Sequence, residues 1–200
     1  MPELPRVFLV RHGETPWTLT GQHTGRTDLP LTESGERQAR QLATGLAALP
    51  VERVLSSPSQ RARRTAELAL PYARVQVDDD LMEWDYGAYE GRRTADVRVE
   101  RPGWRLFQDG CPGGETLDAV ATRADRVVDR IRTDGGTVLL FGHRDLLRVL
   151  AVRWIGLVPL EGRRLQLQTA SASVLGYDHD LAEPVIHAWS CRGAVSTEGR

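Results

Sequence analysis

Two histidines and an arginine directly follow apolar runs that are typical of strands. In an α/β protein, side chains at this position can form a ligand-binding or catalytic site. The segment RHGETPW follows the run Val7–Val10, so Arg11 and His12 come at its carboxyl end. The segment GHRDLLR places His143 after the run Thr137–Phe141. Because neighbouring strand residues point to opposite faces, Arg11 and His12 can share one pocket only where the strand has ended. Ligands of open parallel sheets collect at this edge.

Two further segments bring an arginine and a carboxylate toward the same edge. SSPSQRARRTA follows the run Val51–Leu55 and contains Arg61, and LMEWDYGAYEG follows the run Arg74–Val77 and contains Glu83. Successive residues of a helix point in different directions. We therefore expect Arg61 to face the site and the two later arginines of the RARR string to face solvent.

This set of side chains suits phosphoryl transfer. A phosphoryl group in flight spreads negative charge over its oxygens, and the guanidinium forks of Arg11 and Arg61 match that shape. The neutral imidazole of His12 is a competent nucleophile near neutral pH, and His143, protonated beside the anion, would hold charge. Glu83 would protonate the leaving oxygen and then activate water, which requires a raised pKa.

The elements that must position these side chains follow a regular alternation. Strand-like runs alternate with helical patterns, which predicts a three-layer α/β/α fold with a mostly parallel sheet. Apolar residues at intervals of three and four predict a helix over Leu117–Ile131. A second helix is expected after Pro30 with Thr32 as its cap, and a third over about Pro58–Leu70.

The later chain completes one domain, residues 1–192. The runs Ala172–Tyr177 and Val185–Trp189 flank an Asp/His-rich turn and predict an antiparallel hairpin at the sheet edge. Residues 85–115 form a long stretch without a clean period, which favours a lid-like insertion. Residues 193–200 lose apolar periodicity and are expected to form a polar tail.

Composition excludes several classes of protein. With 40% apolar and 26% charged residues and a net charge of −1, the chain is typical of a soluble globular domain without a general attraction for nucleic acid or membranes. No apolar run approaches the ~20 residues of a membrane span. Two distant cysteines, Cys111 and Cys191, and no leader pattern favour the cytoplasm. His23, His179 and His187 lack metal-ligand spacing, so we expect neither metal nor cofactor, and we interpret all three as ordinary loop or strand residues.

Five segments in order extend these observations to a family. RHGETPW, TGRTDLPLTESGERQA, SSPSQRARRTA, EWDYGAYEG and GHRDLLR together resemble the histidine phosphatase superfamily, also called phosphoglycerate mutase-like, across most of the chain. GQHTGRTDLPLT, EWDYGAYEG and DGCPGGET are most similar to small members that include sedoheptulose-bisphosphatase-like and mycobacterial acid-phosphatase-like proteins. The family contains dimers, so the resemblance allows a homodimer.

The resemblance implies roles for individual residues. It implies that His12 is the phosphorylated nucleophile, that Arg11, Arg61 and His143 form the phosphate pocket, and that Glu83 is the proton donor. It also implies contacts with phosphate or substrate for Thr18, Thr24 and Gly25, and a contact of Tyr86 with the rest of the substrate.

Two positions depart from the family pattern. Arg144 follows the second catalytic histidine where the family usually has glycine, so it either turns outward or adds a substrate contact. Thr18 stands where asparagine is common in the family, and the threonine side chain is a shorter donor.

Gly13 would let the backbone approach the phosphate. Of the tryptophans, Trp17, Trp84 and Trp104 are candidates for the pocket wall.

Three functions follow from these expectations. The first is a metal-independent phosphomonoesterase for a small sugar phosphate or bisphosphate, working through a phosphohistidine. A phosphoglycerate mutase would use the same covalent step but return the phosphoryl group to a bound product. A non-catalytic phosphate-binding module, in which Arg144 ended catalysis, is the third. Turnover of p-nitrophenyl phosphate separates the enzymes from the module, and phosphate transfer faster than hydrolysis identifies a mutase.

Overall fold

The computed structural model describes residues 4–192 and contains a six-stranded sheet with the order β3-β2-β4-β1-β5-β6. The strands are β1 (Arg6–Arg11), β2 (Arg53–Ser56), β3 (Val75–Val77), β4 (Thr137–Gly142), β5 (Ala172–Tyr177) and β6 (Pro184–Cys191). The first four strands in this order run parallel, whereas β5 is antiparallel to β1 and β6 is antiparallel to β5. The predicted hairpin at the sheet edge is therefore present.

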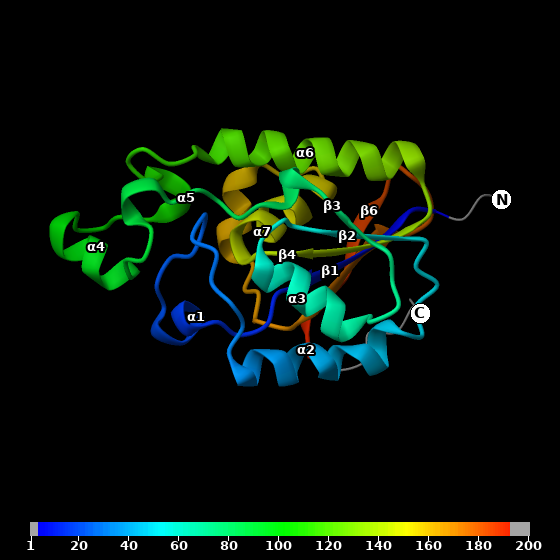
Figure 1. The fold of residues 1–200 in the computed structure, drawn as a ribbon. Helices are drawn as coiled ribbons and strands as arrows, with labels where there is room; N and C mark the ends of the chain where they lie inside the picture. The colour runs from blue at the N-terminus through cyan, green and yellow to red at the C-terminus, as the bar shows by residue number, and fades with distance from the viewer. Residues whose placement is uncertain (1–3, 193–200) are drawn as a thin grey trace.

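Helices cover both faces of this sheet (Figure 1). The α-helices are α1 (Pro16–Thr20), α2 (Glu33–Leu46), α3 (Gln60–Ala69), α4 (Thr94–Glu100), α5 (Leu106–Asp109), α6 (Leu117–Asp134) and α7 (Arg144–Trp154). Short 3-10 helices are η1 (Asp79–Leu81), η2 (Gly87–Tyr89) and η3 (Pro159–Arg164). Within the described residues, none of these helices has the length and apolarity that a membrane crossing requires.

Alternation along β1 divides the core into two layers. Val7 and Leu9 pack with the buried stripes of α6 and α7, whereas Phe8 and Val10 pack with those of α2 and α3. β4 is buried along its whole length, as expected for a central parallel strand with helices on both faces. The three-layer α/β/α architecture predicted from the sequence is confirmed.

Local sequence explains where the helices begin. The Thr32 side chain accepts a hydrogen bond from the Gly35 amide at 2.9 Å, so the predicted cap of α2 is confirmed. The helix expected from about 58 to 70 is α3, and that expected over 117–131 is α6 with one further turn. The strand expected over Val51–Leu55 lies later, at β2, because Val51 is held in a turn by its bond to the Leu49 carbonyl.

The stretch 85–115 is folded around a small core of its own. It contains η2, α4 and α5, and Tyr89, Val97 and Trp104 form a separate buried cluster. Figure 1 shows α4 and α5 projecting beside the end of the sheet near α1. The lid-like role of this stretch stays a prediction, and the expected tail, residues 193–200, lies outside the described residues.

Candidate active site

The register of the sheet brings the two histidines together. β1 and β4 are adjacent and parallel, and Arg11 is paired with Gly142 at their ends. The next residue of each chain segment is a histidine, and the His12 amide donates to the Gly142 carbonyl at 3.0 Å. The ring centroids of His12 and His143 are 5.2 Å apart, with the ring planes at 59°. Both rings are buried.

The surroundings of His12 leave its outer nitrogen free. Nδ1 lies 2.7 Å from the Gly13 carbonyl, which can only accept, so Nδ1 carries the hydrogen and Nε2 keeps its lone pair. Burial lowers the pKa of His12 well below its usual value, and the charges of Arg61 and Arg11 lower it further. The ring is therefore neutral and able to act as a nucleophile.

His143 is oriented by two hydroxyl groups that follow β2. Its Nε2 lies 2.8 Å from Ser57 Oγ and 3.2 Å from Ser59 Oγ, while Nδ1 is buried without a hydrogen-bond partner. Burial, followed by the charges of Arg61 and His12, lowers its pKa well below the usual value. These surroundings favour the neutral ring, so the protonated His143 expected from the sequence requires the charge of a bound anion.

Hydrogen bonds to backbone carbonyls hold the two expected arginines in place. Arg61 on α3 is fully buried and donates through its Nη groups to the carbonyls of Thr27 at 2.9 Å and Gly25 at 3.0 Å. Arg11 donates from Nη1 to the Leu167 carbonyl at 2.6 Å. Burial, then the charge of Arg144, lowers the pKa of Arg11 to about 10. The Nε atoms of both arginines are buried and have no partner.

These unpartnered atoms are concentrated in one place. In the part of the chain that the structure describes, four buried side-chain nitrogen or oxygen atoms lack a hydrogen-bond partner. Three of the four are donors or rings of the strand-tip site, namely Arg11 Nε, Arg61 Nε and His143 Nδ1; the fourth is Glu90 Oε2. Because unsatisfied buried polar atoms are costly, their clustering indicates a site built for an acceptor-rich ligand.

Glu83 is held by backbone amides beside this cluster. Its Oε1 accepts from the amides of Trp84 at 2.9 Å and Leu146 at 3.0 Å, and Oε2 accepts from the Asp145 amide at 3.1 Å. The latter two amides belong to the first turn of α7. Burial raises the pKa of Glu83 above its usual value, and the Asp145 charge adds to this, against the opposing effect of the three amides. The raised pKa is what a proton donor requires.

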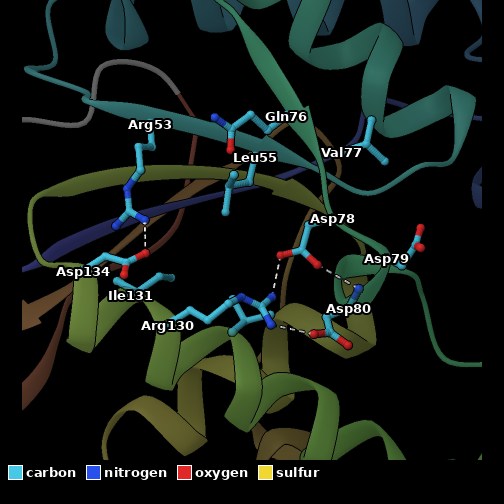
Figure 2. A pocket seen from close by; sticks show the side chains of 11 residues that line it. Arg53, Leu55, Gln76, Val77, Asp78, Asp79, Asp80, Arg130, Ile131 and Asp134 are labelled. Atoms are coloured by element: carbon cyan, nitrogen blue, oxygen red, sulfur yellow. Dashed lines mark hydrogen bonds and ion pairs between the residues drawn. The ribbon is translucent and has the colours of Figure 1, made fainter.

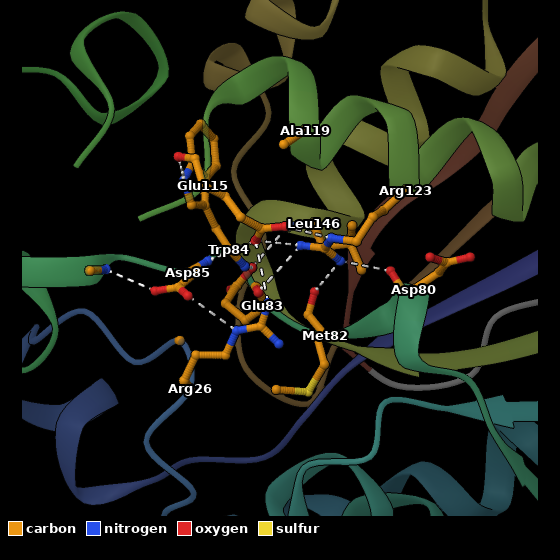
Figure 3. A network of polar contacts seen from close by, with 12 residues as sticks. Arg26, Asp80, Met82, Glu83, Trp84, Asp85, Glu115, Ala119, Arg123 and Leu146 are labelled. Atoms are coloured by element: carbon orange, nitrogen blue, oxygen red, sulfur yellow. Dashed lines mark hydrogen bonds and ion pairs between the residues drawn. The ribbon is translucent and has the colours of Figure 1, made fainter. Parts of the chain in front are cut away.

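A network of ion pairs supports the backbone that carries Glu83 (Figure 3). Arg123 on α6 donates to the carbonyls of Asp80 and Met82, each at 2.8 Å, and contacts both oxygens of Glu115 at 2.8 Å. Arg123 thereby ties the residues before Glu83 to α6. Glu83 is positioned from two sides, by this network and by the start of α7.

The other predicted contacts differ in how they meet the cavity of about 110 Å³ at the strand tips. Thr24, Tyr86 and Arg144 line it. Thr18 also lines it, but its hydroxyl donates to the Thr15 carbonyl at 2.9 Å and accepts from the Thr15 amide, which completes the cap of α1. The side chain of Arg144 is half exposed at the mouth and therefore lines the site rather than turning away from it.

At Gly13 and Gly25, close contacts with other backbone segments leave no room for a side chain. The Gly25 amide donates to Glu90 Oε1 at 2.8 Å, and a Cβ there would lie 2.4 Å from the Trp84 carbonyl. Gly25 therefore supports Arg61 from behind and does not line the cavity. A Cβ on Gly13 would lie 2.5 Å from the Gly35 carbonyl, so this glycine permits close packing against α2, and approach of its backbone to a phosphate stays a prediction.

The aromatic residues are also distributed differently from the expectation. Trp17 lines the cavity, and Trp104 lines a neighbouring one, but Trp84 is fully buried in the core and forms no wall. His23, interpreted from sequence as an ordinary loop residue, lines both cavities and packs 4.8 Å from the ring of Tyr86. His23 lies within the segment GQHTGRTDLPLT, but its place at both cavities depends on folding of the stretch 85–115.

Ser57, Ser59 and Asp145 are further site residues that the sequence reasoning did not select. All three flank predicted residues within SSPSQRARRTA and GHRDLLR, which is the signal that could have identified them.

Among the described residues, the group suited to holding a metal is Asp178, His179 and Glu183, in the exposed β5–β6 turn away from the strand tips. There His179 Nδ1 lies 2.6 Å from Glu183, an ion pair that raises the pKa of His179.

Comparisons with known proteins agree with this geometry. The family model of the histidine phosphatase superfamily (branch 1) matches residues 7–191. An acid phosphatase of Mycobacterium tuberculosis is 37% identical over 182 residues, covering 89% of this chain and 89% of that protein. The sedoheptulose 1,7-bisphosphatase of Saccharomyces cerevisiae is 38% identical over 193 residues, covering 78% of this chain and 70% of that protein. The solved structure of the Mycobacterium tuberculosis open reading frame Rv3214 has a TM-score of 0.88 at 35% identity, covering 94% of this chain and 98% of that chain.

Proposed function

The chain belongs to the histidine phosphatase superfamily (branch 1), and we propose that this phosphomonoesterase hydrolyses a small phosphorylated metabolite through a phosphohistidine formed on His12. The observation that carries the proposal is that His12, with its free Nε2, has three close neighbours that each keep a buried nitrogen without a partner: Arg11 Nε, Arg61 Nε and His143 Nδ1. A tetrahedral phosphate offers acceptor oxygens in several directions and would satisfy these atoms together. The two imidazole rings, 5.2 Å apart, would then flank one phosphoryl group.

The first half of the reaction transfers the phosphoryl group to the enzyme. Nε2 of His12 attacks phosphorus, the N–P bond forms and the P–O bond to the leaving group breaks. The leaving oxygen takes the proton of the Glu83 carboxyl, which the raised pKa of that group supports. The Gly13 carbonyl keeps the hydrogen on Nδ1 and so keeps the ring in the reactive tautomer.

The second half releases phosphate. Glu83, now a carboxylate, takes a proton from water as the water oxygen attacks phosphorus, and the N–P bond breaks. Orthophosphate leaves, and His12 and Glu83 return to their starting protonation states. Arg11, Arg61 and His143 stabilise the negative charge on the phosphoryl oxygens in both halves. None of these steps uses a metal ion.

The two cysteines bear on the cellular compartment of the protein. Cys111 and Cys191 are both free thiols, which supports a reducing compartment, the cytoplasm. Burial raises the pKa of the Cys111 thiol to about 12, which supports a structural role for this residue rather than nucleophilic chemistry. A homodimer stays a prediction.

The test measures turnover of p-nitrophenyl phosphate by the full chain in the presence of a chelator. We expect activity in the wild type and a loss of more than about 10⁴-fold in His12→Ala, since its nucleophile is absent. His179→Ala, an exposed histidine of the β5–β6 turn, is the matched control and should retain activity. Rapid quenching should trap one phosphoryl group on the peptide that contains His12.

Two outcomes would reject this function. A folded His12→Ala variant with normal turnover would exclude the covalent mechanism, and a wild type without turnover at any acidic or neutral pH would exclude the phosphatase. Transfer of phosphate between positions of phosphoglycerate, at rates well above hydrolysis, would make the enzyme a mutase.

A further inference from the structure

A second cavity of about 300 Å³ opens beside the catalytic pocket. Its wall comes from the 85–115 stretch on one side and from α7 and η3 on the other. It shares four lining residues with the catalytic pocket, namely His23, Thr94, Arg144 and Asp145. The second space, which we call the arginine cavity, therefore adjoins the catalytic pocket at these four residues.

Positive charge dominates the arginine cavity. Five of its lining residues are arginines: Arg98, Arg105, Arg144, Arg148 and Arg163. Its one lining carboxylate, Asp145, is already engaged, because Oδ1 pairs with Arg148 at 2.5 Å and Oδ2 accepts from the Tyr86 hydroxyl at 2.7 Å. The carboxylate neutralises at most one guanidinium, so a net positive charge faces the space.

Three of the other arginines are only loosely engaged by the protein. Within the described chain, the Arg105 side chain has no hydrogen-bond or ion-pair partner, and Arg98 uses only Nε, which donates to the Trp104 carbonyl at 2.9 Å. Arg163 lies 3.9 Å from Glu161, at the limit of an ion pair. Their remaining N–H groups are available to a ligand.

Other surface arginines of this protein are more closely paired. Arg64 donates to Glu36 at 2.9 Å, and Arg92 contacts Glu100 at 2.7 Å. Loose pairing is therefore not general for arginines in this chain. Gathering several unneutralised guanidinium groups around one space costs repulsion, which an anionic ligand would relieve.

Apolar side chains also line the arginine cavity. Trp104, Leu106 and Phe107 line the same cavity, and the Phe107 ring packs against the guanidinium of Arg148, with the carbon 4.8 Å from the ring centroid. Such a surface suits the carbon skeleton that joins two charged ends of a small metabolite.

We propose that the arginine cavity binds a second anionic group of the substrate, a phosphate or a carboxylate, so that the enzyme prefers small metabolites with two anionic ends. The inference rests on the proposed function, because the first phosphate must lie at His12 for the second group to reach the cavity. Planar guanidinium forks contact either kind of oxyanion through paired hydrogen bonds. Arg144, at the boundary of both cavities, would contact the bound substrate between its two ends.

The experiment compares substrates with one and two anionic groups on the full chain. Steady-state kcat/KM is measured for p-nitrophenyl phosphate, fructose 6-phosphate, fructose 1,6-bisphosphate and 3-phosphoglycerate. The variant is Arg105→Gln/Arg163→Gln, and the matched control is Arg101→Gln, an exposed arginine of the same stretch that does not line the cavity. The bisphosphate and the phosphoglycerate distinguish a second phosphate from a carboxylate.

We expect the wild type to favour at least one two-anion substrate over fructose 6-phosphate. The double variant should lose about tenfold to a hundredfold in kcat/KM for that substrate, mainly through KM, since hydrogen bonds to a charged group are removed. Turnover of p-nitrophenyl phosphate should stay unchanged in the variant, and Arg101→Gln should behave as wild type throughout.

The two proposals fail in different ways. If the wild type does not hydrolyse p-nitrophenyl phosphate, the phosphatase function itself is wrong. If it does, but the double variant loses no more on two-anion substrates than on p-nitrophenyl phosphate, the second anion site is wrong. A wild type that prefers fructose 6-phosphate to both two-anion substrates would overturn it as well.

Discussion

The cavity of about 470 Å³ between β3 and α6 (Figure 2) is larger than the strand-tip pocket of about 110 Å³, and both are rich in charged residues. In the larger cavity nearly all the charged side chains are paired, although its four aspartates outnumber its two arginines. Arg53 contacts Asp134 at 2.6 Å, and Arg130 contacts Asp78 at 2.5 Å and Asp80 at 2.8 Å. Every charged side chain of this lining except that of Asp79 therefore has an ion-pair partner.

The strand-tip pocket has the opposite property. Arg11 and His12 line it, and the buried Arg61 and His143, which do not line it, lie close to His12. Arg11, Arg61 and His143 each keep a buried nitrogen without a partner, and His12 keeps a free ring nitrogen. Cavity volume therefore does not identify the functional site, whereas unsatisfied polar groups do. A ligand gains most binding energy where buried polar groups of the protein lack hydrogen-bond partners. The smaller pocket is the one equipped for chemistry.

The largest expected effect tests the smaller region through its carboxyl group. Glu83→Gln keeps the shape of the side chain but cannot donate a proton. We expect kcat to fall by about 10²-fold to 10⁴-fold on an alkyl phosphate such as glycerol 3-phosphate, whose leaving oxygen needs that proton. The loss should be much smaller on p-nitrophenyl phosphate, whose leaving group departs as an anion. Steady-state rates on the two esters check this.

The pH profile of the same variant supplies the control. The raised pKa of Glu83 means that its proton is held above the usual pKa of 4.5 and is lost as pH rises further. The lowered pKa of His12 means that its ring becomes protonated, and inactive, only well below pH 6.5. Wild-type activity should therefore be greatest in acid and fall as Glu83 ionises. Equal losses on both esters, or an unchanged alkaline limb in Glu83→Gln, would contradict this role.

Sequence alone predicted the parts of this site that strand ends determine. Arg11, His12 and His143 follow apolar runs that could only be strands, and parallel pairing places their ends at one edge. The orientation of Arg61 followed from helix geometry, and the structure buries it while its neighbour Arg64 is exposed. Much of the fold was predictable for the same reason, since apolar patterns mark the strands and the helices α2, α3 and α6. The helix α7 was not predicted, because most of its residues are buried and leave no regular apolar stripe.

Other features depended on contacts between distant segments, which periodicity does not encode. His23 joins the site because the 85–115 stretch folds against it, and the arginine cavity forms only when that stretch meets η3. The close approach of other backbone segments to Gly13 and Gly25 was likewise not predicted. A glycine shows that something approaches closely, and the sequence does not say whether it is a ligand or another backbone.

An intermediate effect is expected from ligand binding to the smaller region. Orthophosphate should engage the unpartnered atoms of Arg11, Arg61 and His143 only in the folded state, because the site does not exist in the unfolded chain. At about 100 times its dissociation constant, phosphate should stabilise the protein by about 2.7 kcal/mol. Thermal unfolding with and without phosphate measures this. Arg11→Gln should reduce the shift, and an equal shift in that variant would contradict phosphate binding at the strand tips.

The smallest expected effect comes from the larger cavity. Arg130→Gln removes the ion pairs to Asp78 and Asp80, but the arginine side chain is 44% exposed, so solvent screens the interaction. The free energy of unfolding should fall by no more than about 1 kcal/mol. Because these charges satisfy each other and touch no reacting group, kcat/KM and the stabilisation by phosphate should equal those of the wild type. A loss of activity in folded Arg130→Gln would show that the larger cavity serves the reaction after all, and would remove the distinction between paired and unpaired charges on which the assignment of the smaller pocket depends.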